Sequence, residues 1–238
     1  MKAKILVAAS VLAALGATSA ASAELLVTYT GTIASGEDVT GIFGTSGADL
    51  TGNSFVARYL IDPSLGNQST TPISNQAQGG TNLGVASPIV SANVTINGIT
   101  FDFAGPASFA QVFGRNGSDS EQIHQYEYNP IIGNIQYSEF MTNFIDTSTL
   151  AIPKSLNTPF TYTATAQDQS GDDLDINNFD MQNHVNIDQA NLTLNSTILT
   201  VALLPSTPEP STWVMVLAGF AAFGIAAWQR TRSAKLAG

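Results

Sequence analysis

The chain of 238 residues contains no cysteine and has two histidines, His124 and His184. The absence of cysteine excludes disulfide bonds, thiol catalysis and cysteine-ligated zinc. A secreted domain of this size can be stabilised by its hydrophobic core without disulfides. Two histidines leave few side chains that could act as a general base or a metal ligand near neutral pH. The residue inventory is therefore poor for an enzyme.

Positive charge is also scarce, because residues 24–204 contain three basic residues, Arg58, Arg115 and Lys154. The same stretch contains seventeen of the eighteen acidic residues, which gives it a formal net charge of −14. A surface of this charge repels nucleic acid and anionic lipid, favours solubility and attracts cations. We therefore exclude nucleic acid as a partner.

The other basic residues lie at the two ends of the chain. Lys2 and Lys4 precede an apolar run, and Ala21 and Ala23 place small residues at the positions where a signal peptidase cleaves. This order predicts a secretory signal peptide over residues 1–23, and it implies the Sec machinery and a signal peptidase as partners. The alternative is an uncleaved N-terminal anchor.

Residues 205–238 combine prolines with an apolar run. The prolines of Pro208-Glu209-Pro210 fix φ and lack an N–H donor, so neither a helix nor a central strand can continue through them. The eighteen residues from Ser211 to Trp228 carry no charge. As a helix they would span about 27 Å, which is enough to cross a thin bilayer core.

The residues around this run fit a single transmembrane helix. Trp213 and Trp228 stand at its two ends, where their rings favour the membrane interface, and Gly219 lies within it. A basic tail follows, which is what retention on the cytoplasmic side requires. Its members are Arg230, Arg232 and Lys235.

This order of motif, span and basic tail resembles the PEP-CTERM sorting signal of Gram-negative bacteria. The resemblance covers about a seventh of the chain and concerns destination, not activity. It implies that an exosortase, a membrane-embedded processing enzyme, recognises Pro208-Glu209-Pro210 while the protein is held in the inner membrane. The exported part would then reach the cell surface or the extracellular matrix, where such signals accompany exopolysaccharide production. The alternative is an ordinary single-span anchor behind a proline-rich linker.

Between the two ends, apolar residues alternate with polar ones at the period of half-buried strands. The clearest signal is Val94–Phe103, where Asn97-Gly98 predicts a hairpin with a type I′ turn. The polar stretch Ser64–Pro88 predicts a long surface loop, and Phe140–Ile145 fits either a strand or a short helical turn. The other expected strands are Leu25–Ile33, Phe55–Ile61, Phe109–Phe113, Ile123–Tyr128, Phe160–Ala166 and Leu192–Leu204.

Many short strands separated by turns, with no amphipathic helix, indicate an all-β domain. We predict one exported domain over residues 24–204, an antiparallel β-sandwich or a jelly-roll-like fold. A signal peptide precedes this domain and a single transmembrane helix follows it.

An acidic cluster suggests a calcium site. Asp173, Asp175 and Asn177 have the i, i+2, i+4 spacing of an EF-hand-like loop, whose oxygens converge because the loop wraps the ion. Asn178 replaces the expected glycine, and His184 stands where that loop has a bidentate glutamate. The alternative is a solvated acidic loop with Asx turns. Calcium is the one cofactor that the sequence suggests.

Two further sites involve the region around His124. Alternation places Gln122 and His124 on one strand face and Glu121 on the other. Glu127 and Glu139 could act as acid and base on a glycoside, although no known hydrolase motif is present. The nearby tyrosines 126, 128 and 137 could instead stack on sugar rings, or form part of the core or its rim.

Taken together, the sequence predicts a non-enzymatic exported protein of the cell surface or of a biofilm matrix, sorted and processed through Pro208-Glu209-Pro210. The first alternative is a carbohydrate-binding module assisted by calcium, with exopolysaccharide as its partner. A secreted glycoside hydrolase is the weaker alternative.

Overall fold

The computed structural model describes residues 24–103, 106–129, 134–147, 149–155, 157–180 and 185–204. All of them belong to one compact unit, Ala23–Leu204. The predicted signal peptide and the predicted sorting segment lie outside the described residues. Within the part of the chain that is described, no helix is long and apolar enough to cross a membrane.

The first half of the described chain is almost entirely extended. Its elements are β1 (Leu25–Asp38), β2 (Ala48–Asp49), β3 (Ser54–Ile61), β4 (Asn67–Thr70), β5 (Ser74–Gly79), the 3₁₀ turn η1 (Thr81–Leu83), β6 (Ile89–Ile96) and β7 (Ile99–Phe103). The hairpin predicted over Val94–Phe103 is confirmed. Its turn residues Asn97 and Gly98 have φ angles of 53° and 77°, as a type I′ turn requires.

The second half continues in the same way. Its strands are β8 (Phe109–Arg115), β9 (Ser118–Asn129), β10 (Asn134–Ile145), β11 (Phe160–Thr163), β12 (Gln169–Ser170), β13 (Asp172–Asp180) and β14 (Val185–Leu203). Every pairing that joins these strands is antiparallel. The predicted all-β antiparallel class is therefore confirmed.

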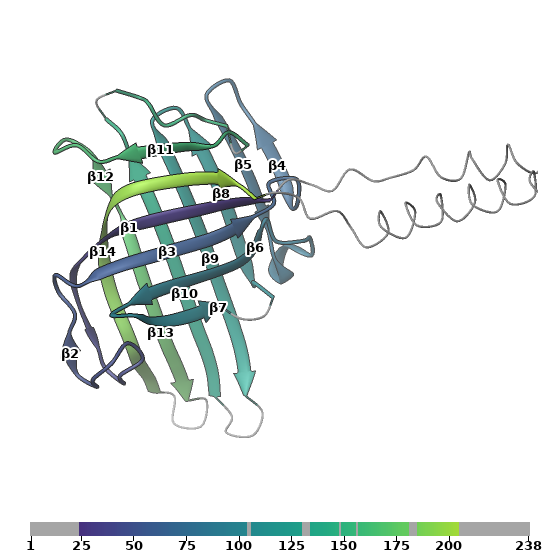
Figure 1. The fold of residues 1–238 in the computed structure, drawn as a ribbon. Coiled ribbons are helices and arrows are strands. Elements are labelled where there is room, and N and C mark those ends of the chain that lie inside the picture. Colours follow the sequence, from purple (N-terminus) through teal and green to yellow (C-terminus); the bar gives the residue numbers. More distant parts are fainter. Residues whose placement is uncertain are drawn as a thin grey trace, which may run out of the picture. The chain divides into compact units, whose positions relative to one another are not determined.

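The strands form one sheet that curls over itself. Along its main path the order is β4-β5-β8-β9-β10-β13-β14-β1-β3-β6-β7. Strands β1, β3, β6 and β7 run across strands β8, β9, β10 and β13, so the sheet has two halves whose inner faces meet (Figure 1). Orthogonal packing of this kind needs strands that bend from one layer into the other.

Strand β14 makes that bend. It pairs with β13 through residues 185–194 and with β1 through residues 191–203. Its buried positions are even up to Ser196 and odd from Leu199 onwards. The change coincides with a register shift against Thr30/Gly31 of β1. A bulge at this point turns the strand and keeps its apolar side chains inside.

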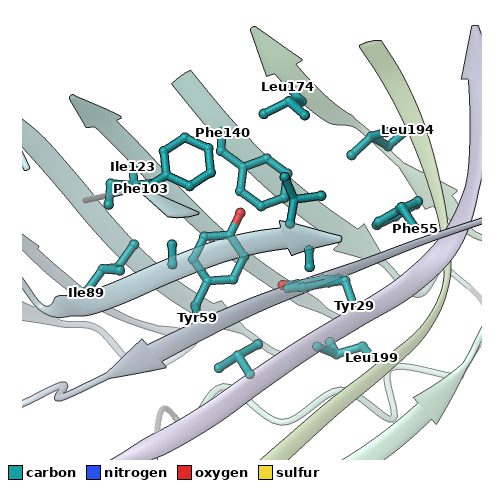
Figure 2. Close-up of a cluster of buried hydrophobic side chains, with 14 of the residues drawn as sticks. Tyr29, Phe55, Tyr59, Ile89, Phe103, Ile123, Phe140, Leu174, Leu194 and Leu199 are labelled. Carbon is teal, nitrogen blue, oxygen red and sulfur yellow. The ribbon is translucent and has the colours of Figure 1, made fainter. Parts of the chain in front are cut away.

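An aromatic stack joins the two halves. The ring of Phe140 on β10 lies between those of Tyr59 on β3 and Phe103 on β7, with centroids 5.3 Å apart in both pairs. Tyr29 on β1 meets Tyr59 edge-on. Figure 2 shows these rings pointing toward one another from opposite sides of the interior. The core therefore lies between the two halves of the curled sheet.

Two predictions need correction, and one open alternative is resolved. The two layers are halves of one hydrogen-bonded sheet instead of the separate sheets of a sandwich or jelly roll, because β14 and β1 continue around the bend. The stretch Ser64–Pro88 is not a long loop, since it contains β4, β5 and η1. All four side chains of β4 are polar and exposed, so that strand carries no apolar alternation. Phe140–Ile145, which was open between strand and helical turn, is strand.

Candidate functional site

The residues predicted to bind calcium lie on a strand. Asp173, Asp175 and Asn177 belong to β13 and alternate with Leu174 and Ile176, which are buried. An extended strand does not wrap an ion, so the predicted EF-hand-like loop is wrong. Among the described residues, no three His, Asp or Glu side chains converge as a metal cluster would. A calcium ion held in another geometry stays a prediction.

His124 and Glu139 meet on the outer face of the sheet. They face each other across β9 and β10, with His124 Nε2 3.2 Å from Glu139 Oε1. Gln122 Nε2 donates to the same glutamate oxygen at 3.1 Å. The predicted face of Gln122 and His124 is therefore confirmed. Glu127 is the register partner of Gln136. This pair lies three residues along the strands from the pair of His124 and Glu139.

The tyrosines predicted to contact sugar lie on the same two strands. Tyr126 of β9 and Tyr137 of β10 are register partners, and Tyr128 pairs with Ile135. Their side chains lie outside the described residues. The sugar-binding face therefore stays a prediction.

A buried acid pair was not predicted. Asp119 and Glu121 lie two positions apart on the inner face of β9, where they are 5% and 0% exposed. The Tyr29 hydroxyl on β1 donates to Glu121 Oε2 at 2.5 Å. The other carboxylate oxygen of Glu121, Oε1, is buried and has no hydrogen-bond partner among the described residues. The sequence alternation correctly placed Glu121 on the face of β9 opposite to that of His124, but it did not predict that the glutamate is buried.

The surroundings of this pair favour the protonated forms. Burial raises the pKa of Asp119 to about 7. Burial, followed by the nearby charge of Asp119, raises the pKa of Glu121 well above its usual value. Burial, followed by the charge of Glu121, raises the pKa of Tyr29 as well. The two carboxyl groups therefore hold protons more tightly than they would in water.

Other buried carboxylates accept backbone N–H groups. The Asp38 carboxylate accepts three such bonds, from Gly41, Ile42 and Phe43, at 2.7–2.9 Å. The Asp146 carboxylate does the same for the loop that follows β10, where it accepts the N–H groups of Thr149 and Ala151. These two acids are engaged in fixing loops and are poorly placed to act on a ligand.

Asp172 links two strands that flank its own. Its carboxylate accepts the backbone N–H of Asn143 on β10 at 2.6 Å and that of Ser196 on β14 at 3.0 Å. Burial nevertheless raises the pKa of Asp172 to about 6. This acid lies beside the predicted calcium residues Asp173 and Asp175 but points to the opposite face of β13. It therefore links strands of the sheet.

A surface depression is lined by one of the three basic residues of the exported domain, Arg115, and lies beside a second, Lys154. It has a volume of about 480 Å³ and is lined by the β4–β5 turn together with Phe113 and Arg115 of β8. Lys154 Nζ donates to the carbonyl oxygen of Pro72 in that turn at 2.9 Å. Exposed Ile73 adds apolar surface. The depression therefore combines an apolar floor with positive charge in a domain that is otherwise strongly negative.

The described residues define an acidic, all-β domain that ends directly before the predicted sorting segment. A family model for the PEP-CTERM protein-sorting motif matches residues 206–231. The chain therefore carries a PEP-CTERM protein-sorting motif, as the resemblance of its C-terminal residues predicted. Comparisons with curated proteins and with solved structures gave no match.

The matched range contains most of the predicted sorting residues. Pro208, Glu209 and Pro210 fall within it, and so does the span from Trp213 to Trp228. Arg230 is included, whereas Arg232 and Lys235 lie beyond it. The motif indicates export to the cell envelope or surface and processing by an exosortase-type enzyme. The membrane span itself, and cleavage at Ala21 and Ala23, stay predictions, because these residues lie outside the described part.

Proposed function

We propose that the protein is a non-enzymatic component of the cell surface or of an exopolysaccharide-based biofilm matrix, delivered by its C-terminal motif. The observation that carries the proposal is the PEP-CTERM match at residues 206–231, attached to an exported-type β domain. The arrangement of its acids supports a structural role. Asp38 and Asp146 fix loops, and Asp119 and Glu121 lie buried between the halves of the sheet.

The test of delivery uses the native host. A variant in which Pro208, Glu209 and Pro210 are all changed to Ala is compared with the unaltered chain by fractionation and by intact mass. We expect the unaltered protein to reach the surface or matrix without its C-terminal tail. We expect the triple variant to stay in the membrane fraction at full length. Asp102→Asn, a change at an exposed position of β7 outside the matched range, is the control and should be delivered normally. Equal delivery and equal mass of the triple variant would refute the sorting role.

We propose binding of an acidic polysaccharide as a second candidate function. The observation that favours it is the depression beside β4 and β5, where Arg115 lies at an apolar floor and Lys154 is bonded to a carbonyl oxygen of the adjoining turn. An arginine fork matches a carboxylate, and an aromatic ring such as Phe113 suits the apolar face of a sugar. At physiological salt the Debye length is about 8 Å, so local charges matter more than the distant acids.

Polygalacturonate is a suitable probe for this second function, with dextran as the neutral comparison. We expect weak binding of polygalacturonate that falls with added salt and falls further in Arg115→Gln and in Phe113→Ala. Arg58→Gln removes the third basic residue of the domain, away from the depression, and should bind as the unaltered chain does. Binding that is equal for dextran, or unchanged in Arg115→Gln, would refute this function. Addition of EDTA separates any contribution of calcium.

A further inference from the structure

The buried acid pair lies where the two halves of the curled sheet meet. Asp119 and Glu121 project inward from β9, and the residues opposite them come from the other half. The space between them is about 10 Å³, room for roughly one water molecule. Its remaining walls are Val27 of β1, Ile61 of β3, Phe160 of β11, Val201 of β14 and Ser155. Separation of the halves at this place would admit water to the pair.

Among the residues that the structure describes, no basic side chain neutralises the pair. Arg58 and Arg115 are exposed, and Lys154 is bound to the carbonyl oxygens of the β4–β5 turn. The titratable groups that face the pair are Tyr29 of β1 and Tyr59 of β3, with Asp172 of β13 acting on Tyr59. None of these three can supply a positive charge. An ionised carboxylate left buried without a cation is strongly unfavourable.

A metal ion does not suit the space beside Asp119 and Glu121. Calcium takes six to eight oxygen ligands, whereas two carboxyl groups and the Ser155 hydroxyl are the polar side chains that line the space. The other lining residues are apolar. Protons require no such ligand shell. They also suit Glu121 Oε1, which is buried and has no partner among the described residues.

We propose that Asp119 and Glu121 form a proton-holding pair that makes the closure of the two halves depend on pH. The exported domain is then most stable in acidic surroundings and loosens as the surroundings become alkaline. This inference goes beyond the proposed function, because it concerns how the domain responds to the medium and not where the domain is delivered.

The direction of the effect follows from the pKa values. Unfolded Asp and Glu lose their protons near pH 4. In the folded state burial raises the pKa of Asp119 to about 7, and burial together with the charge of Asp119 raises that of Glu121 well above its usual value. Between these limits the folded state binds more protons than the unfolded state. Stability is therefore greatest at low pH and falls as the pH rises through this window. Each proton held changes the unfolding equilibrium constant about tenfold per pH unit.

The test compares the full-length protein in non-ionic detergent with Asp119→Asn, Glu121→Gln and the double variant. Each is unfolded in urea between about pH 6 and about pH 8 and followed by far-UV circular dichroism. Below about pH 7 we expect the unfolding constant of the unaltered chain to rise about tenfold per pH unit for each carboxyl group that is protonated in the folded state. Above about pH 7 the rise should become smaller, because Asp119 then loses its proton in the folded state as well. The rise should be smaller in each single variant and largely absent in the double variant. Asp102→Asn, at an exposed position of β7, should keep the original pH dependence.

Infrared spectroscopy gives a second readout that does not depend on unfolding. We expect a band from a protonated carboxyl group in the unaltered protein at about pH 6, and its loss in the double variant. An unfolding constant that is independent of pH, or a missing band, would overturn the proposal. So would calcium chloride that stabilises the unaltered protein at about pH 8 but not the double variant, because the pair would then hold a cation.

Discussion

Asp38 is an acidic residue of the exported domain that stabilises a loop. Its carboxylate is fully buried, yet it accepts three backbone N–H groups from the loop that follows β1. These donors would otherwise lie unsatisfied beside Phe43, which is also buried. Charge-assisted bonds of this kind are stronger than neutral ones. The acid therefore fixes the loop against the core.

We expect Asp38→Ala to destabilise the domain by about 2–4 kcal/mol, because three donors lose their acceptor and a small cavity is left. Asp38→Asn keeps one oxygen in place and should cost less. Urea unfolding of the full-length variants in detergent measures both changes. Asp102→Asn, at an exposed position of β7, is the control, and we expect no change in its unfolding free energy. A loss in Asp38→Ala as small as in this control would contradict the role of the carboxylate.

Part of the site at this scale could be predicted from the sequence. The alternation Glu121, Ile123, Gln125 correctly places these side chains on one face, and the structure shows all three buried. The burial of the acids could not be predicted, because it depends on Tyr29, which lies 92 residues away in the chain. Asp119 closely follows Asn116-Gly117, a pattern typical of a polar turn, so the sequence favours an exposed acid at this position.

At the scale of single elements, the predictions succeeded where the signal was local. The β6–β7 hairpin was found because Asn97-Gly98 determines its turn. Strand β13 was interpreted as an acidic loop, because Asp173 and Asp175 alternate with only two apolar residues, Leu174 and Ile176, which are buried. Strand β4 was missed because its sequence Asn-Gln-Ser-Thr pairs through the backbone alone. Polar strands are thus fixed by their neighbours and not by their own pattern.

The bend between β1 and β14 depends on Gly31. A Cβ at this position would overlap the carbonyl oxygen of Asn195 and come within 2.9 Å of the Phe55 ring. We expect Gly31→Ala to destabilise the domain by about 3 kcal/mol, because backbone and ring must move apart. Gly171→Ala is the matched control, since a Cβ at Gly171 meets nothing within 4 Å. Thermal unfolding of the two variants decides the matter, and equal melting temperatures would contradict the prediction.

At the scale of the whole molecule, the sheet is complete only when the first and last strands of the domain pair with each other. The first strand, β1, pairs with the last, β14, from Leu25↔Leu203 to Glu37↔Asn191. The two layers could be anticipated from the alternation, but their union in one sheet could not. The two layers form one sheet because of a bulge in β14, and no residue type in the sequence marks the position of that bulge. The sorting motif begins at residue 206, directly after this closing strand, so the domain is complete before the motif starts.

The net charge of the exported domain leads to a prediction for the molecule as a whole. Residues 24–204 carry a formal charge of −14, and like charges on a compact surface repel one another. Raising the salt from about 10 mM to about 150 mM shortens the Debye length from about 30 Å to about 8 Å and weakens this repulsion. We expect the melting temperature of the full-length protein in detergent to rise by about 3–6 °C, which corresponds to roughly 1–2 kcal/mol for a domain of this size. The measurement compares sodium chloride with calcium chloride at equal ionic strength. Screening alone predicts similar shifts of the melting temperature with both salts. An additional shift with calcium that is lost in Asp173→Asn and Asp175→Asn would support a cation site on the outer face of β13. A melting temperature that does not respond to either salt would show that the acids are too far apart to destabilise the fold.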